Sequence, residues 1–253
     1  MTVLSEPGAA YQVCGITIAA LNLEQAAQTL VQRSLSRGPL EVHLCNAYTL
    51  SLVKSDPELT AALHSSGLNL ADGTPVAWLG RNHGMRGPVR GPDLMPAVVE
   101  LGVRSQLSHY LYGGLPGVAG AAAAELRRRA PGVRFAGMES PPFHRLSDDE
   151  LADLALRVRE SKAHIVWVGI GTPAQDHLVP RLAEAAEVAV VPVGAAFDFL
   201  SGRVKVAPRF MHGKGLEWVH RLAHEPRRLW RRYLIGTPRF AALAIRRRDI
   251  NLP

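Results

Sequence analysis

Cysteine and long apolar runs are scarce in this sequence of 253 residues. Cys14 and Cys45 are its only cysteines, too few for a disulfide framework or a cysteine metal site. We expect both to be buried thiols in a reducing compartment. No stretch approaches the roughly 20 apolar residues that span a bilayer. The opening MTVLSEPGAA has an acid and a proline and lacks the apolar run of a signal peptide, so the sequence indicates a cytoplasmic protein.

Several motifs with well-defined chemistry are also missing. The glycine-rich segment GIGTPAQ (169–175) has no lysine, which excludes a Walker loop. The chain has no Asp-X-Asp pair for a metal-held nucleotide sugar and no Gly-X-Ser-X-Gly elbow. His220 and His224 have helical i, i+4 spacing, but no third ligand is nearby in the sequence. We therefore expect neither a metal nor a cofactor.

Basic charge gathers at the C-terminal end. Residues 219–253 hold nine arginines, no lysine and two acids, and their local charge of +7 equals that of the whole chain. The rest of the chain is balanced. A general nucleic-acid-binding protein would more often spread basic charge over its folded face.

The segment PRRLWRRYLIG (226–236) predicts an amphipathic helix within this basic region. On a helical wheel four arginines, including Arg228, Arg231 and Arg232, share a sector of roughly 140°, opposite Trp230 and other apolar residues. We expect Pro226 to start the helix and Gly236 and Pro238 to stop it. A basic face with aromatic residues on the apolar side suits an anionic membrane interface. Packing on the body with a solvated arginine face is the alternative.

Short apolar runs alternate with helix-length amphipathic segments from residue 40 to residue 196. This pattern predicts an α/β fold with a mostly parallel, Rossmann-like sheet covered by helices on both faces. We expect a catalytic body over residues 1–212 and an arginine-rich helical appendage over residues 213–253. In such sheets ligands bind beyond the carboxyl ends of the strands, so the residues that follow each strand are the candidates for a site.

Polar residues follow three of the expected strands. Asn46 follows LEVHLC (40–45), where it can cap a helix. Asp72 ends the strand LNLA (68–71) and is either an Asx turn or helix cap, or a general base. Asp198 in GAAFDFLSG is similarly ambiguous.

Two glycine-rich turns follow other strands. GIGTPAQ includes Gly169 and Gly171, and YGGLPG includes Gly113 and Gly114. Backbone amides at such helix starts can hold a diphosphate, although a turn without a ligand is equally consistent with either segment alone. Gln175 lies in the first helical turn, from which we expect its side chain to reach the ligand.

The segment MRGPVRGPDLM (85–95) is expected to be a loop. Its Arg86 and Arg90 are either solvated charges or part of a lid that brings arginine to a phosphate.

Seven segments in this order resemble the WecG/TagA/CpsF family of bacterial glycosyltransferases, glycosyltransferase family 26. They are CNAYTL, LADGTPVAW, RGPDLM, LYGGLPGVA, VGIGTPAQD, PVGAAFDFLSG and GLEWVHRLAHEPRRLWRRY. The resemblance covers about residues 12–245. It implies an inverting, metal-independent transfer of a sugar, of the N-acetylmannosamine type or a related hexose, from a UDP donor. The implied acceptor is an undecaprenyl-diphosphate-linked sugar in cell-surface polysaccharide or teichoic acid synthesis.

The resemblance also implies roles for individual residues. Asp72 would be the catalytic base, Asn46 would border the same pocket, and Arg90 would meet phosphate. The donor-site residues would be Gly113, Gly114, Gly169, Gly171, Gln175 and Asp198. The appendage would complete the site and engage the inner face of the cell membrane through Arg221, Arg228, Arg231 and Arg232.

Two other functions fit parts of the sequence. An NAD-type oxidoreductase could use the strand-edge glycines, but the acidic residue expected at a strand end about 20 residues after GIGTPA is missing. A nucleic-acid-binding module could use the basic region, but it rests on that region alone. We favour the transferase and expect no nucleic acid partner. The sequence leaves the donor sugar and a possible homo-oligomer open.

Overall fold

The computed structural model describes residues 9–65, 67–204, 222, 230, 234 and 236–246. Eight strands form one sheet in the order β1-β2-β4-β3-β8-β7-β5-β6. The strands are β1 (Ala10–Val13), β2 (Ile16–Ala19), β3 (Leu40–Cys45), β4 (Leu68–Ala71), β5 (Ser108–Gly113), β6 (Arg134–Glu139), β7 (Ile165–Gly169) and β8 (Ala189–Pro192). Only the β1–β2 pair is antiparallel, and the other neighbours are parallel. The predicted α/β fold with a mostly parallel sheet is therefore confirmed.

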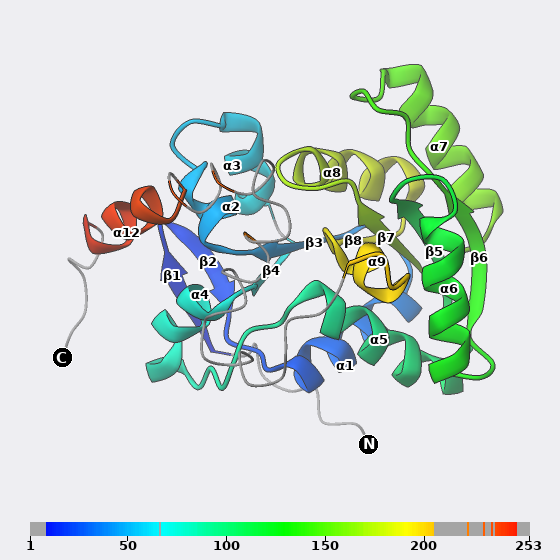
Figure 1. Cartoon of the computed structure of the whole chain (residues 1–253), viewed down its shortest axis with the longest axis horizontal. Coiled ribbons are helices and arrows are strands. Elements are labelled where there is room, and N and C mark those ends of the chain that lie inside the picture. The colour runs from blue at the N-terminus through cyan, green and yellow to red at the C-terminus, as the bar shows by residue number, and fades with distance from the viewer. Residues whose placement is uncertain are drawn as a thin grey trace.

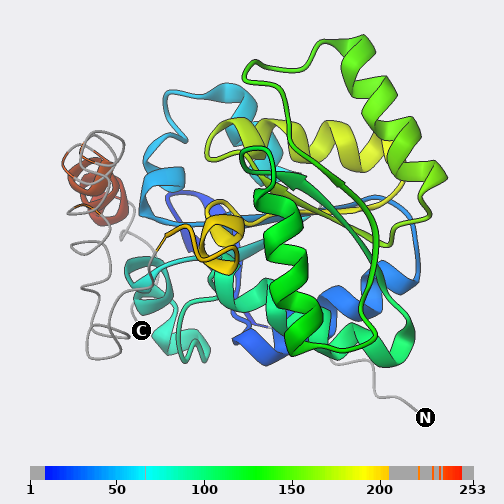
Figure 2. The same ribbon diagram turned by 45° about the vertical axis from the view of Figure 1, so that its right-hand side comes forward.

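Helices cover both faces of the sheet (Figure 1). One layer contains α1 (Leu23–Leu35), α5 (Gly91–Gly102), α6 (Val118–Arg129) and α9 (Ala196–Leu200). The other contains α3 (Pro57–His64), α7 (Asp148–Glu160) and α8 (Ala174–Ala186). In Figure 1 α3, α8 and α7 lie above the sheet, with α1 and α5 below it. Figure 2 shows the first layer from another side, where α6 and α9 lie next to each other.

The central strands are apolar because they are buried on both faces. Every residue of β5 and β8 is buried, as are the first four of β7. Successive side chains of β7 point to opposite faces of the sheet. Trp167 therefore packs toward α5, α6 and α9, whereas Val166 and Val168 pack toward α7 and α8. Cys14 and Cys45 are both buried, as predicted, and neither is in a disulfide bond.

Three shorter helical elements connect strands near the β4 side of the sheet. They are α2 (Ala47–Ser51), α4 (Thr74–Leu79) and the 3-10 turn η1 (Arg81–His83), and a second such turn, η2 (Val103–Ser105), follows α5. The sequence TPVAWLGRNHG (74–84) predicts a single helix closed by Gly84, but the helix breaks at Gly80. A Cβ at Gly80 would lie 2.5 Å from the Tyr11 ring, so the chain needs glycine there to pass the hairpin.

The segment 85–95 is not a loop throughout, and that prediction is corrected. Its second half is the first turn of α5, which begins at Gly91 with a proline in its first two positions, where the missing N–H costs no hydrogen bond. The N-terminal hairpin β1–β2 and the helix α1 were not predicted either. The expected strand over residues 40–45 and that over 68–71 match β3 and β4.

The C-terminal region contributes one described helix, α12 (Thr237–Arg246). We expected Gly236 and Pro238 to end a helix, but Pro238 lies in the first turn of α12, where proline is well tolerated. The helix packs on α2, and its Phe240 is buried in an apolar cluster with Leu50 and Ala77. The described residues do not include the expected boundary between residues 212 and 213, most of the predicted helix over residues 226–236, or Arg221, Arg228, Arg231 and Arg232. Among the helices that are described, none is long and apolar enough to cross a bilayer.

Candidate functional site

The predicted site residues lie at one edge of the sheet. Strands β4, β3, β8, β7 and β5 are consecutive neighbours and run parallel, so their carboxyl ends meet at the same edge. Asp72 follows β4, Asn46 follows β3, and Asp198 lies in α9 after β8. The two glycine-rich turns follow β7 and β5. The helices after the adjacent strands β3 and β8 lie in opposite layers, which is the arrangement at which open α/β sheets bind ligands.

Asn46 and Asp72 are in direct contact. The Asn46 side-chain oxygen accepts hydrogen bonds from the backbone N–H of Tyr48 at 3.0 Å and of Thr49 at 3.1 Å, and thereby caps α2. The same amide then directs its Nδ2 to the Asp72 Oδ2, 3.2 Å away. The Asp72 backbone N–H donates to the Cys45 carbonyl at 2.9 Å. The carboxylate is therefore held in one orientation at the ends of two adjacent strands.

The carboxylate of Asp72 is not used to cap the helix that follows it. The N-cap of α4 is Gly73, and no side chain hydrogen-bonds to that helix start. Gly73 has a φ of 94°, which a residue with a side chain adopts only with strain. Of the two interpretations of Asp72 as a structural residue, the helix cap is therefore wrong.

Arg90 lies between the ends of β4 and β8. The backbone N–H of Val89, just before it, donates to the carbonyl of Ala71 at 2.7 Å. Gly91, just after it, lies so close to β8 that a Cβ would be 2.6 Å from the Val193 carbonyl oxygen. The Arg90 Nε donates to the Asp93 Oδ2 at 2.7 Å, and both side chains are about one-third exposed. The arginine is thus fixed beside the end of β4. Its contact with Asp93 was not predicted from the sequence.

The two glycine-rich turns pack directly on each other. A Cβ on Gly113 would lie 2.7 Å from the backbone of Gly169, and the N–H of Gly114 donates to the Gly169 carbonyl at 3.1 Å. Gly171 has a φ of 85°. Gly169 is in turn close to Gly194, which follows β8. Because these glycines have no side chains, the ends of β5, β7 and β8 can come together.

Gln175 is buried rather than projecting outward. Its side chain is turned toward its own loop, where Oε1 accepts from the Gly171 N–H at 3.1 Å and Nε2 donates to the Thr172 hydroxyl at 3.4 Å. The side chain thereby satisfies a backbone donor that the turn leaves unpaired. In this position Gln175 supports the shape of the GIGTP turn, and its contact with a ligand stays a prediction.

Asp198 belongs to the first turn of α9. Its Oδ1 lies 3.9 Å from an Arg203 guanidinium nitrogen, and its side chain is 20% exposed. Its backbone carbonyl accepts from the N–H of Val204 at 3.1 Å. The residue therefore lies at the same edge of the sheet as Asn46 and Asp72, and its carboxylate is partly exposed.

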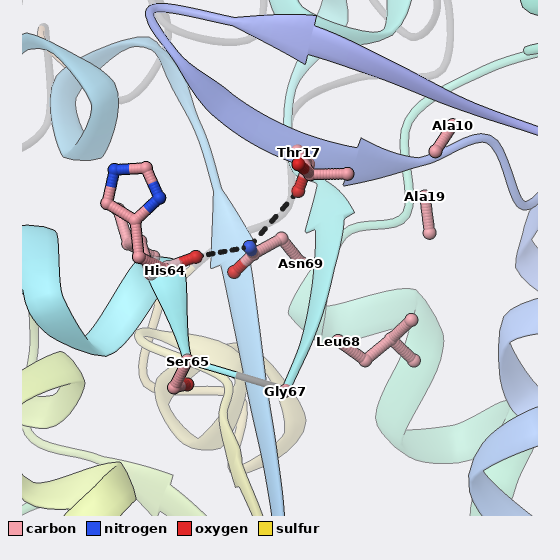
Figure 3. Close-up of a pocket in the computed structure, with 9 residues that line it drawn as sticks. Ala10, Thr17, Ala19, His64, Ser65, Gly67, Leu68 and Asn69 are labelled. Atoms are coloured by element: carbon pink, nitrogen blue, oxygen red, sulfur yellow. Dashed lines mark hydrogen bonds between the residues drawn. The ribbon is translucent and has the colours of Figure 1, made fainter.

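Two hollows lined by described residues lie elsewhere on the surface. One of about 240 Å³ lies between β2, the end of α3 and the start of β4 (Figure 3). There Asn69 donates to the carbonyl of Thr17 at 3.1 Å and to that of Leu63 at 2.8 Å, so its amide is used by the backbone. Another, of about 140 Å³, lies between β6 and α7. Neither is lined by a predicted site residue. No group of three or more His, Cys, Asp or Glu side chains that could hold a metal ion occurs in the described part of the chain.

The sequence model of the glycosyl transferase WecG/TagA/CpsF family matches residues 11–251. The chain belongs to this family. It is therefore a glycosyltransferase of cell-surface polysaccharide synthesis, with a sugar donor and an acceptor. The match includes β1 and α12, so the family's sequence pattern extends over the body and the C-terminal region alike. The oxidoreductase and nucleic-acid alternatives have no support from this assignment.

Proposed function

We propose that this glycosyltransferase moves a sugar, of the N-acetylmannosamine type or a related hexose, from a UDP donor to an undecaprenyl-diphosphate-linked sugar, with inversion. Asp72 is the general base. The observation that carries this assignment is the hydrogen bond from Asn46 to Asp72. It orients one carboxylate at the sheet edge where ligands bind, without using it to cap α4.

In the proposed reaction the acceptor hydroxyl attacks the anomeric carbon of the donor sugar from the face opposite UDP. The new C–O bond forms as the bond to the UDP oxygen breaks, and its electron pair leaves with UDP. The hydroxyl proton passes to the Asp72 carboxylate. Direct displacement in one step inverts the anomeric centre.

The leaving group needs positive charge because UDP departs as an anion. Arg90, fixed beside the end of β4, can bind phosphate oxygens with its guanidinium. The backbone N–H groups of the turns at Gly113–Gly114 and Gly169–Gly171 offer dipoles. In this proposal Arg221, Arg228, Arg231 and Arg232 of the appendage supply further positive charge for the leaving group. With the leaving group stabilised by these arginines and backbone N–H groups, the proposed reaction requires no metal ion.

The acceptor is a lipid, so we place the enzyme at the inner face of the cell membrane. Two apolar side chains of the basic region support this, since Trp230 is 42% exposed and Leu234 is 61% exposed. Aromatic and aliphatic side chains among arginines are typical of elements that lie in an anionic membrane interface. In this proposal the appendage of residues 213–253 brings the body to its substrate.

Asp72→Asn tests the role of the base. The amide has nearly the same shape but cannot take the proton, so we expect kcat to fall by roughly 10²–10⁴-fold. The affinity for UDP, measured by calorimetry, should not change. If Asp72→Asn keeps full turnover, Asp72 is not the base.

A further inference from the structure

A buried histidine and a buried carboxylate face each other beneath the site. His43 lies on β3 and Asp176 in the first turn of α8, and both residues are 0% exposed. The His43 Nδ1 and the Asp176 Oδ1 are 3.5 Å apart. Among the described residues, the other polar atom of each side chain, His43 Nε2 and Asp176 Oδ2, has no hydrogen-bond partner. The pair is thus the main polar contact that either side chain makes.

Such a pair is costly for a core. Removing a carboxylate from water is costly, and one polar partner offsets this cost only in part. Apolar residues would fill the same space between β3 and α8 at lower cost. The position of the pair offers a reason for its presence.

Asp176 lies at the start of a helix, where its charge affects the binding of an anionic ligand. It follows Gln175 directly, in the first turn of the 13-residue helix α8, whose N-cap Pro173 provides no side-chain cap. A helix start attracts anions, but a carboxylate in that turn repels a second anion and weakens the attraction.

The charge of Asp176 also acts at the end of β3. The pKa of the Cys45 thiol is raised well above its usual value, first by burial, then by the charge of Asp176 and then by that of Asp72. The carboxylates of Asp176 and of the proposed base Asp72 therefore both lie near Cys45, at the end of β3.

We propose that His43 neutralises Asp176 so that the start of α8 and the turn before it can hold the diphosphate of the donor. This proposal rests on the proposed function, because it assumes a UDP donor at this edge of the sheet. His43 does not touch the substrate. It acts through Asp176, on the donor diphosphate and not on the nucleoside.

The test is a cycle of four proteins: the unchanged chain, His43→Gln, Asp176→Asn and the double variant. The affinity of each for UDP and for uridine, which lacks the diphosphate, is measured by calorimetry, with the melting temperature alongside. His43→Gln leaves Asp176 uncompensated and should weaken UDP binding by about tenfold, the order of magnitude for one charge near an anion in a protein. Uridine binding should not change.

Asp176→Asn removes the charge and keeps an acceptor for His43, so it should bind UDP at least as tightly as the unchanged chain. The double variant should bind UDP like Asp176→Asn. If His43→Gln does not fold, these two variants still carry the test.

Three results would overturn the proposal. They are equal UDP affinity in His43→Gln and the unchanged chain, equal losses for UDP and uridine, and a double variant that binds UDP more weakly than Asp176→Asn. If the unchanged chain itself binds no UDP, the proposed function fails and this inference fails with it.

Discussion

At the scale of single residues, Asn46 combines two tasks that the rest of the site depends on. Its oxygen caps α2, and its nitrogen holds the carboxylate of Asp72. A cap of this kind stabilises a helix by about 1 kcal/mol. The geometry means that the start of α2 and the orientation of Asp72 are set by the same side chain.

Asn46→Asp separates these tasks. An aspartate keeps the capping oxygen, loses the N–H donor and places a second negative charge beside Asp72. A like charge disfavours the ionised form of a carboxylate, so we expect the acid limb of the pH–rate profile to move to higher pH and the rate at pH 7 to fall. Thermal unfolding should show that the fold is kept. An acid limb at the original pH would show that Asn46 does not act on the base.

The buried side chain of His109 makes the stability of the fold depend on pH. It is fully buried, and its Nδ1 accepts a hydrogen bond from the Trp167 indole N–H at 3.1 Å. Burial, with a smaller contribution from the charge of His164, lowers the pKa of His109 to about 3. Below about pH 6.5 the unfolded chain protonates this histidine and the native state does not.

Stability should therefore fall as the pH decreases from about 6.5 toward 3, by about 1.4 kcal/mol per pH unit for this one proton. His109→Gln keeps an acceptor for Trp167 but does not titrate. The free energy of unfolding of this variant should therefore change less steeply with pH, by the contribution of one proton. Urea unfolding at pH 7, 6 and 5 measures both slopes. Equal slopes would contradict the account.

At the scale of elements, the sequence could predict the strands better than their pairing. The strands β3 and β4 were predicted with their observed ends because apolar runs stop at Asn46 and at Asp72-Gly73. The pairing of β3 with β8 joins residues about 150 positions apart, such as Leu40 and Ala189, and no local pattern encodes it. The start of α5 was missed because Gly91 and Pro92 are typical of loops. Gly91 is needed there by the backbone of Val193.

In the candidate site, too, the sequence could predict positions along the chain but not contacts between side chains. Strand ends and polar residues predicted that Asp72 and Asn46 lie at one edge of the sheet, whereas Arg90 was expected near a phosphate from its loop and from the family resemblance. The sequence could not show that Asn46 contacts Asp72 or that Arg90 pairs with Asp93. It also could not show that Gln175 turns into its own loop, because side-chain directions depend on the packing of distant elements.

Gly113→Ala tests the contact between the two glycine-rich turns. The new methyl would lie 2.7 Å from the backbone of Gly169, so β5 and β7 would have to separate at the site. We expect a loss of about 1–3 kcal/mol in the free energy of unfolding and weaker UDP binding.

Gly120→Ala is the matched control for this change. Gly120 is exposed in α6, and a Cβ there would have no neighbour within 4 Å. Alanine should stabilise this helix by roughly 0.5–1 kcal/mol. Urea unfolding of both variants gives the comparison, and equal effects would show that the two turns are not in close contact.

At the scale of the whole molecule, the C-terminal helix α12 is joined to the part of the body that carries Asn46, the residue in contact with the proposed base. Gly236 lies so close to α2 that a Cβ would be 2.9 Å from the Tyr48 ring, and the Phe240 side chain is 5% exposed in the adjoining apolar cluster. The helix α2 begins at Asn46. The net charge of the chain equals the charge of residues 219–253. The helix α12 is therefore held beside α2, close to Asn46, and in the proposed function this contact joins the C-terminal region to the site.

Release of UDP from a panel of UDP-sugars, with a lipid-diphosphate-linked sugar as acceptor and EDTA present, tests the central claim most directly. The panel includes N-acetylmannosamine, N-acetylglucosamine, their uronic acids, glucose and galactose. We predict acceptor-dependent release of UDP from one donor, undiminished by EDTA, with inversion at the anomeric carbon. Release that requires a metal ion would contradict the mechanism, and the absence of any UDP binding would contradict the account of the site.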